Sequence, residues 1–329
     1  MLADTAWVWS QYDHQLFLNT VEGPGGDAAV LRLKAPGLPP SRRALALTTD
    51  SNSRWCSLDP REGTALLVAE GVLNVSCAGA RPLAVVNCLN FGNPEHPEVM
   101  WELSEAVDGL ADACRAFGIP VAGGNVSLYN ESAGQDIDPT PVIGVVGVID
   151  DLQRRPPGVR LVDGGTIVML GHRESPTLAG SRWADARHGH RGGRLAPLDA
   201  ARHLAVSALV RELVASDLLA GVHDIGDGGV GLALAEMAVH SGVGFRIHGV
   251  AGHGELFAEG PSRVVACVTP DRVGEVAARA EAVGVPLHLV GVAGGDRLVV
   301  EGLLDVGLPP ATRRWNDSLP SAMAAARGH

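Results

Sequence analysis

The stretch that decides the fold is residues 81–125, RPLAVVNCLNFGNPEHPEVMWELSEAVDGLADACRAFGIPVAGGN. It opens on an apolar run, 83–88, that is short enough for a central β-strand. Residues 97–117 then predict a helix, because Pro97 suits a first helical turn and apolar residues recur at spacings of three and four. A short apolar run at 120–122 leads into a glycine turn. The stretch therefore predicts strand, helix and strand, with polar loops at the strand ends.

The rest of the chain continues this alternation, which is typical of an α/β fold with layered sheets and helices. Residues 63–78 are apolar nearly all round, which predicts a helix buried between two layers. We expect residues 173–193, rich in Gly, Ser, Arg and His, to form a surface loop. The remaining expected strands are 28–33, 44–49, 142–149, 166–170, 263–268, 286–292 and 297–300, and the remaining expected helices are 200–215, 230–240, 271–283 and a C-terminal one from about 309.

Length and composition predict two domains. The chain has 329 residues, 46% of them hydrophobic, and a single core rarely grows beyond about 250–300 residues. Residues 150–165 carry Arg154-Arg155-Pro156-Pro157-Gly158, which is linker chemistry. We therefore expect one domain over residues 1–151 and a second over 152–329.

The charged residues exclude several functions. The net charge of −11 disfavours nucleic acid as a partner, because an acidic protein repels the phosphate backbone. Lys34 is the only lysine and stands in a Pro/Gly-rich setting. A Walker A phosphate loop is therefore absent, and Schiff-base chemistry is not expected.

The five cysteines and the lack of long apolar runs suggest a location. No two cysteines are spaced as C-x-x-C, which disfavours a zinc site or a redox dithiol. Their odd number in a large chain disfavours a disulfide framework. The N-terminal residues have no basic region and no long apolar run, so we do not expect them to form a signal peptide. No run approaches the roughly 18 apolar residues that a membrane span needs. We expect a cytoplasmic protein that does not engage membranes.

Four polar clusters in the first half each lie near an apolar strand, namely 48–52, 87–94, 123–130 and 136–141. Loops at strand ends are where α/β proteins place ligand groups. Glycines allow close approach to a phosphate, and Asp, Asn and Ser oxygens suit Mg²⁺. The clusters therefore suggest a site for magnesium and phosphate.

Each cluster also has a purely structural interpretation. Asn-x-Gly-Asn-Pro and Gly-Gly-Asn are common turn sequences. Asp50 could cap a helix or close a turn. Asn87 ends a run expected to be buried, so its partner is either a ligand or a local hydrogen bond.

The second half contains one comparable segment. Residues 221–229, GVHDIGDGG, suggest either an anion or metal site at a helix N-terminus or an Asp-capped helix after a glycine turn. His14 and His223 are weak candidates for acid/base roles, because a single His is more often structural or exposed. His188 and His190 lack a third metal ligand nearby in sequence.

The ordered motifs of the chain resemble phosphoribosylformylglycinamidine synthase, and specifically the second half of its large catalytic subunit in the multi-subunit form. The resemblance extends over essentially the whole chain. Its motifs are 11–15 (QYDHQ), 19–25, 58–60 (LDP), 89–94 (LNFGNP), 97–101 (PEVMW), 123–130 (GGNVSLYN), 140–144 (TPVIG) and 223–229 (HDIGDGG).

The resemblance implies a fold and an activity. The fold is a pair of aminoimidazole-ribotide-synthetase-like domains: a barrel-forming mixed-sheet domain and an α/β layered domain beside it. The activity is the ATP-dependent amidation of formylglycinamide ribotide in purine biosynthesis, with ATP and Mg²⁺ bound and with ammonia from a glutaminase subunit. A small accessory subunit completes the implied complex.

The resemblance also implies roles for four residues. Asn87 and Gly124 correspond to ATP contacts, Asn125 to a Mg²⁺ ligand and Ser127 to a contact with the substrate phosphate. Asn87 stands where many relatives carry Asp, so it keeps an oxygen and loses the charge. Ser51 replaces a glycine that is common in relatives, which argues against a positive φ there.

The family's catalytic histidines and most of its metal carboxylates have no counterpart among these motifs. The resemblance therefore implies that catalytic residues come from an N-terminal half, with this chain being a truncated piece or a split-gene product. The alternative is a non-catalytic structural module that dimerises through its sheet. A small-molecule kinase of the same superfamily is a third and weaker alternative.

Overall fold

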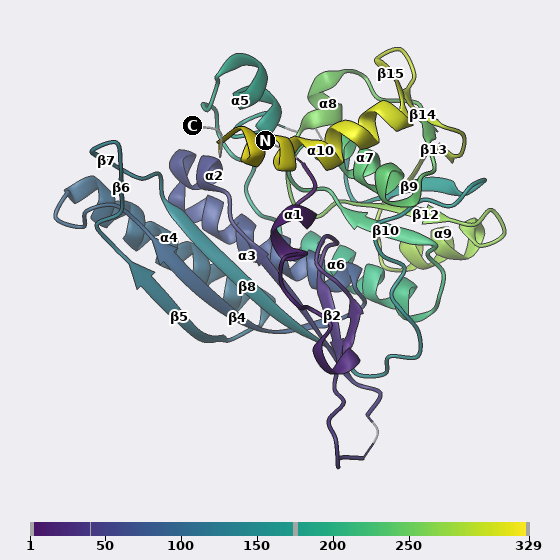
Figure 1. The fold of residues 1–329 in the computed structure, drawn as a ribbon, viewed down its shortest axis with the longest axis horizontal. Helices are drawn as coiled ribbons and strands as arrows, with labels where there is room; N and C mark the ends of the chain where they lie inside the picture. Colours follow the sequence, from purple (N-terminus) through teal and green to yellow (C-terminus); the bar gives the residue numbers. More distant parts are fainter. Residues whose placement is uncertain (1–2, 40, 174–176, 327–329) are drawn as a thin grey trace.

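A computed structural model describes residues 3–39, 41–173 and 177–326. Its strands form two large sheets and one small hairpin (Figure 1). The first sheet has the order β1-β2-β3-β8-β4-β5, and the second has the order β10-β12-β9-β13-β11-β14-β15. The expected α/β fold with mixed sheets is confirmed, and the six-stranded sheet curls as a half-barrel with one open face. The division into domains at residue 151 stays a prediction.

The strands have these bounds: β1 Thr20–Glu22, β2 Ala29–Arg32, β3 Ala44–Asp50, β4 Arg81–Asn90, β5 Val121–Ser127, β6 Glu131–Ser132, β7 Gln135–Asp136, β8 Thr140–Ile149, β9 Thr166–Leu170, β10 Gly221–Asp224, β11 Phe245–Ile247, β12 Val264–Val268, β13 Leu287–Ala293, β14 Arg297–Val300 and β15 Leu304–Gly307. Within the first sheet β4 and β5 are parallel, and the other neighbours are antiparallel.

The helices have these bounds: α1 Ala6–Trp9, α2 Ser53–Leu58, α3 Pro60–Cys77, α4 Pro97–Phe117, α5 Arg182–His188, α6 Ala200–Ala215, α7 Gly229–Ser241, α8 His253–Phe257, α9 Val273–Ala282 and α10 Leu308–Ala326, with a 3-10 turn at Leu16–Leu18. None of the helices in the described part of the chain has both the length and the apolar character needed to cross a membrane.

Helix α3 is the central packing element. It begins at Pro60, where the side chain of Asp59 accepts a hydrogen bond from the backbone N–H of Glu62 and so caps the helix. Both sides of α3 are covered, because Leu67 and Val68 join the core of the first sheet and Leu73 joins the core beneath α6. The expected burial of this helix between two layers is confirmed.

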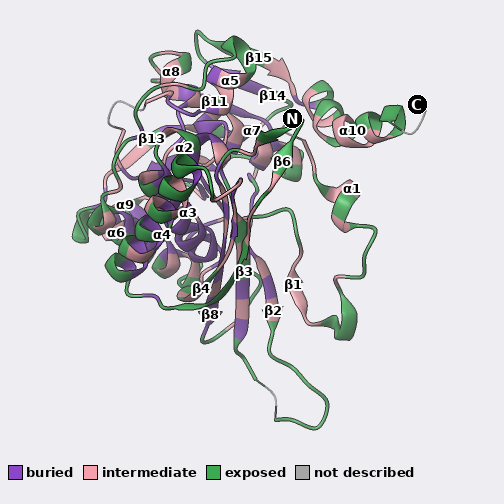
Figure 2. Ribbon diagram, turned by 90° about the vertical axis from the view of Figure 1, so that its left-hand side faces the viewer, coloured by how far each residue is buried: buried purple, intermediate pink, exposed green. Residues whose placement is uncertain are grey.

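The two faces of the first sheet differ. Helices α3 and α4 pack against one face and lie behind β4, β5 and β8 in Figure 1. On the other face Leu47 is 42% and Val86 48% exposed. These side chains line a hollow of about 320 Å³. Figure 2 shows exposed and half-buried residues along these strands. Helices therefore cover one face of the sheet, and the other face is left open.

Three expectations about element bounds need correction. The expected loop 173–193 contains α5, whose N-cap Ser181 accepts a hydrogen bond from the backbone N–H of Ala184. The expected strand 120–122 continues to Ser127, because β4 pairs with it through the glycines. Residues 221–224 form strand β10, paired with β12, where no strand was expected from the sequence.

Candidate functional site

One row of residues across the first sheet brings together separate parts of the sequence. Asp50 on β3 lies opposite Ile143 on β8, and Ile143 lies opposite Asn87 on β4. Asn87 in turn pairs with Gly124 on β5. Neighbouring strands are about 4.8 Å apart, so the backbones of Asp50 and Asn87 are roughly 10 Å apart. We call Asp50, Asn87 and Gly124 the strand row.

Gly124 leaves room for the side chain beside it. A Cβ at this position would lie 2.3 Å from the Asn87 Oδ1 atom, so a larger residue here would displace the Asn87 side chain. Asn87 therefore lies flat over the β5 backbone, on the same face as the fully buried Ile143. This is the face that α3 covers. The two residues with implied ATP contacts are thus brought together by strand pairing.

The other two implied site residues point to the opposite face. Side chains alternate along a strand, so Asn125 and Ser127 share the open face with Val86. The Asn125 side-chain amide lies 3.6 Å from the Cys88 sulfur. The Ser127 hydroxyl lies 3.2 Å from Asn130 Oδ1. The four implied residues therefore form two pairs on opposite faces of one strand pair.

Hydrogen bonds hold the loop around Ser127 in place. The Asn130 side-chain amide donates to the carbonyls of Phe91 and Ser127, at 2.9 Å each. Tyr129 takes a left-handed conformation with φ of 60°, and its N–H donates to the Gly92 carbonyl. The polar clusters 87–94 and 123–130, separate in sequence, thus form one compact corner.

A group of buried acids lies at the Asp50 end of the strand row. We call Asp27, Asp50, Glu70 and Asp224 the acidic cluster. A Cβ on Gly226 would lie 2.9 Å from Glu70 Oε1 and 3.2 Å from Asp224 Oδ2, so these carboxylates converge there. Potential ligand atoms of Asp27, His223 and Asp224 lie within 4.8 Å of one another.

His223 partly balances this negative charge. Its Nδ1 atom lies 2.5 Å from Asp27 Oδ1, and its Nε2 atom lies 2.7 Å from Glu236 Oε2. Burial alone would lower the pKa of His223, but these carboxylates outweigh it and raise the pKa well above its usual range. His223 is therefore an imidazolium ion that two carboxylates hold in place. This geometry does not suit a free acid/base catalyst.

Three carboxyl groups of the acidic cluster, those of Asp50, Glu70 and Asp224, have raised pKa values. Burial raises the pKa of Asp50 to about 7 and that of Asp224 to about 8, with nearby carboxylates adding to the effect. Burial and the charges of Asp50 and Asp224 also raise the pKa of Glu70 well above its usual range. Acids crowded in this way are relieved by a bound cation. Hard oxygen ligands of this kind suit Mg²⁺.

A buried arginine connects the two polar loops that border the acidic cluster. Arg54 on α2 donates to the Gly180 carbonyl at 2.9 Å and to Asp227 Oδ1 at 2.8 Å. Its guanidinium also lies 3.4 Å from Glu259. Asn52 reaches Asp227 as well, at 3.4 Å. The segments 48–52 and 221–229, 175 residues apart, are thereby brought together.

The helix-capping interpretation is wrong for two segments. Asn52 caps α2, and Asp50 instead accepts a hydrogen bond from Asn74 at 2.9 Å. Helix α7 begins after Gly228, which has a φ of 78° and provides no side-chain cap. The aspartates of 221–229 therefore do not cap that helix, and Asp224 faces the acidic cluster.

The sequence did not identify Asp27, Glu70 or Glu236 as site residues. Glu70 had a usable signal, because it is the charged residue within the apolar core of a helix expected to be buried. Asp27 had none, since it follows a glycine turn and reaches the cluster only through folding.

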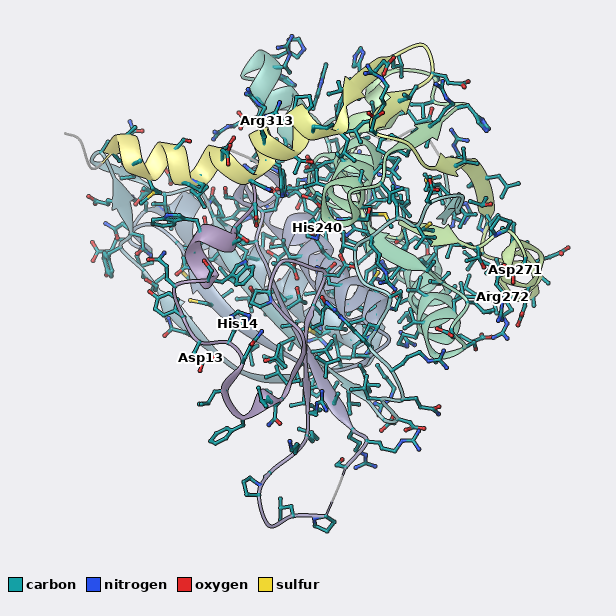
Figure 3. All side chains as sticks on the ribbon, turned by 45° about the vertical axis from the view of Figure 1, so that its right-hand side comes forward. Asp13, His14, His240, Asp271, Arg272 and Arg313 are labelled. Carbon is teal, nitrogen blue, oxygen red and sulfur yellow. The ribbon has the colours of Figure 1, made fainter. Side chains whose placement is uncertain are left out.

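Two other histidines considered from the sequence, His14 and His188, pack against tryptophans. His14 packs edge-on against Trp9 in the N-terminal segment (Figure 3). His188 contacts Trp183 on α5.

Both parts of the chain match known family models. Residues 25–149 match the model described as AIR synthase related protein, N-terminal domain, and residues 162–302 match the one described as AIR synthase related protein, C-terminal domain.

Curated relatives cover the whole chain. Phosphoribosylformylglycinamidine synthase subunit PurL of Moorella thermoacetica is 41% identical over 330 residues, spanning 98% of this chain and 44% of the relative. The same subunit of Thermomicrobium roseum is 44% identical over 320 residues, spanning 95% of this chain and 43% of the relative. The chain thus spans about half the length of the curated relatives it matches.

Solved structures share the fold. PurL from T. maritima, complexed with FGAR, aligns with a TM-score of 0.71 at 18% identity over 94% of this chain and 49% of that one. The protein tt0281 from Thermus thermophilus aligns with a TM-score of 0.60 at 21% identity over 85% of this chain and 90% of that one. The chain therefore belongs to the family of AIR synthase related proteins and is similar to about half of a PurL subunit.

Proposed function

We propose that this chain supplies one half of an ATP-dependent formylglycinamide ribotide amidotransferase of purine biosynthesis, a carbon–nitrogen ligase. The observation that carries the proposal is the strand row, which brings Asn87 and Gly124 into line with the acidic cluster at Asp50. A phosphate-binding backbone beside a cation-binding group of acids suits a nucleotide–metal complex. The relatives at about 40% identity are PurL subunits, and solved T. maritima PurL structures are described as complexes with ATP and FGAR.

The proposed roles are those that the family resemblance implies, and they are divided between the two faces of the sheet. Asn87 and Gly124 contact ATP on the helix-covered face. Asn125 provides a Mg²⁺ ligand and Ser127 a contact to the substrate phosphate, both on the open face. Asn130 holds the Ser127 hydroxyl in place through the hydrogen bonds described above.

The acidic cluster adds a second candidate position for Mg²⁺. Glu70 and Asp224 provide carboxylate oxygens that converge near Gly226, and Asp50 lies near enough to raise the pKa of Glu70. A bound cation there would neutralise phosphate charge as ATP reacts. His223 holds Asp27 toward the cluster rather than transferring protons itself.

The open face of the first sheet fits a second unit of the same fold. Leu47 and Val86 are large apolar side chains left exposed in a curled sheet, and such a face needs a cover. In the proposed enzyme the cover is the N-terminal half, which brings the catalytic residues. Glutaminase and small accessory subunits complete the assembly, as the solved T. maritima PurLQS complex suggests. The domains proposed here are residues 1–151 and 152–329.

The test is an assay of this chain with ATP, Mg²⁺, ammonia and formylglycinamide ribotide. We expect no turnover by the chain alone and measurable turnover when a separately produced PurL N-terminal half is added. Turnover by the chain alone at the rate of an intact PurL would contradict the half-enzyme proposal.

The alternative function is a non-catalytic structural module that dimerises through the same open face. The exposed Leu47 and Val86 favour it as much as they favour a hetero-pair. The acidic cluster distinguishes the two, because a structural module has no need to crowd carboxylates whose pKa values are raised. Restored turnover with the N-terminal half would exclude this alternative.

A further inference from the structure

A groove lined by arginines lies at the far end of the first sheet from the acidic cluster. Five arginines and no carboxylate line it, together with Ser41 and Thr20, around a volume of about 370 Å³. We call it the arginine groove, and its arginines are Arg32, Arg42, Arg43, Arg154 and Arg155. They come from the β2–β3 hairpin and from the segment that follows β8.

Strand direction separates this groove from the candidate site. β2 ends at Arg32 and β3 begins at Ala44, whereas Asp50 is the last residue of β3. Seven residues of extended strand span roughly 20 Å. A ligand in the groove therefore does not touch the acidic cluster.

Backbone hydrogen bonds fix the walls of the groove. The Leu152 N–H donates to the Arg42 carbonyl at 2.6 Å, and the Leu33 N–H donates to the Arg43 carbonyl at 2.8 Å. The Arg32 N–H donates to the Asn19 carbonyl at 2.8 Å. The main chain that carries three of the guanidinium groups is therefore held in place before any ligand arrives, which lowers the entropic cost of binding.

The carboxylates near the groove do not balance its charge. Arg42 pairs with Asp151 at 2.5 Å and Arg155 with Glu22 at 2.7 Å, while Arg43 reaches Asp150 only at 3.9 Å. Asp150 also forms an ion pair with Arg81, which is outside the groove. Within the described residues Arg32 forms no ion pair. Positive charge is therefore left over here, in a chain whose net charge is −11.

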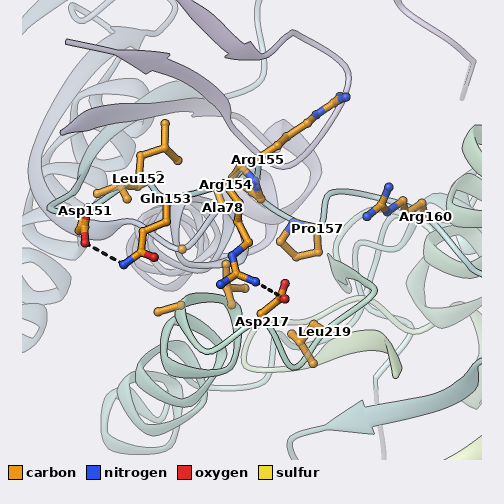
Figure 4. Close-up of a pocket in the computed structure, with 15 residues that line it drawn as sticks. Ala78, Asp151, Leu152, Gln153, Arg154, Arg155, Pro157, Arg160, Asp217 and Leu219 are labelled. Carbon is orange, nitrogen blue, oxygen red and sulfur yellow. Dashed lines mark hydrogen bonds and ion pairs between the residues drawn. The ribbon is translucent and has the colours of Figure 1, made fainter. Parts of the chain in front are cut away.

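Arg154 and Arg155, next to each other in the segment after β8, point in different directions beside the neighbouring cavity. Figure 4 shows Arg154 turned toward Asp217, with which it forms an ion pair, and Arg155 turned the other way. Arg154 thus contributes to the groove mainly by its stem. The other arginines that line the groove are Arg32, Arg42, Arg43 and Arg155. Their ion pairs are largely exposed, and such pairs add little stability.

We propose that the arginine groove binds a small polyanion that carries two or more phosphate groups. Guanidinium groups bind phosphate oxygens through paired hydrogen bonds, and arginines from two segments line this groove. The volume of about 370 Å³ falls in the range of small-molecule sites. A phosphate in the groove would bridge the hairpin and the linker.

Isothermal titration with inorganic tripolyphosphate in EDTA tests the proposal, because without divalent cations the acidic cluster repels this probe. We expect saturable binding with a Kd below about 1 mM that weakens as salt is added. The variants R32A and R42A/R43A should each weaken it, the latter at least about tenfold. R32A breaks no ion pair, so its effect reports ligand contact alone.

The matched control is R313A/R314A, which removes the same charge from the exposed face of α10 (Figure 3). This variant should bind tripolyphosphate like the wild type. The proposal is wrong if the wild type shows no saturable binding, or if the control loses as much affinity as R42A/R43A. Neither outcome bears on the amidotransferase proposal, which the activity assay tests separately.

Discussion

At the scale of single residues, the buried carboxyl group of Asp224 makes the stability of the fold depend on pH. Its pKa of about 8 in the folded chain compares with 3.8 for the ordinary group. The folded state therefore binds more protons than the unfolded state between these values, so the contribution of this group to stability is lost as pH rises through about 8.

The substitution D224N removes this effect. We expect the variant to have a higher free energy of unfolding than the wild type at pH 8 in EDTA, by about 1 kcal/mol or more, because the cost of burying the charge and its repulsion with Asp27 and Asp50 are removed. Mg²⁺ should stabilise the wild type and have less effect on the variant. Urea unfolding measures both. The control D317N, on an exposed part of α10, should change neither quantity, and a destabilised D224N would contradict the account.

His203 has the opposite pH dependence. It is fully buried in α6, and burial lowers its pKa from 6.5 to about 4. The unfolded state then binds more protons between these values, so this group lowers stability as pH falls from 6.5 to 4. Two and a half pKa units correspond to about 3 kcal/mol at most.

The substitution H203Q tests this effect. The loss of unfolding free energy between pH 7 and pH 5 should be smaller in the variant than in the wild type, whatever the change at pH 7. Equal losses would show that His203 is not the responsible group.

At the scale of elements, α3 and α4 pack too closely to admit another side chain. A Cβ on Gly109 would lie 2.0 Å from the Arg61 carbonyl oxygen. We expect G109A to lower the free energy of unfolding by about 1–3 kcal/mol, since one of the helices must move. G274A on α9 is the control, because nothing lies within 4 Å of its Cβ position. It should be neutral or stabilising by up to about 1 kcal/mol. Equal effects in both would contradict the close approach.

The elements that the sequence predicted well are those with long periodic or capped patterns. Helix α4 begins at Pro97 and ends at Phe117, as the pattern indicated, and α3 is buried as its composition required. Helix α5 was missed because it is short and rich in Arg and His, so its sequence shows no apolar periodicity. Strand β10 was missed because Gly221 and the polar pair His223-Asp224 are typical of a turn. Only its pairing with β12 makes it a strand.

Local sequence patterns predicted the polar clusters of the candidate site but not their arrangement in space. The strand-end clusters were visible in the sequence, because polar residues after apolar runs are rare enough to notice. Their division between two sheet faces was not visible, since it depends on the register of β4 with β5. The acidic cluster depends on contacts such as Asp27 with His223, 196 residues apart, which no local pattern reports.

At the scale of the whole molecule, the open face of the first sheet predicts association. We expect the purified chain to self-associate in sedimentation velocity when no partner half is present, because Leu47 and Val86 are exposed in a curled sheet. The double variant L47D/V86D should shift the chain toward monomer. A wild-type monomer at about 100 μM, a concentration well above the Kd of a micromolar dimer, would contradict this expectation.

The central claim is that this chain itself contacts a nucleotide–metal complex, and calorimetric titration with Mg-ATP tests it most directly. We expect saturable heat for the wild type, lost when EDTA replaces Mg²⁺ and weakened in G124A, where the added Cβ meets Asn87. G123A is the control on the same strand, because nothing lies within 4 Å of its Cβ position. No heat for the wild type at millimolar Mg-ATP would contradict the claim and favour the structural module.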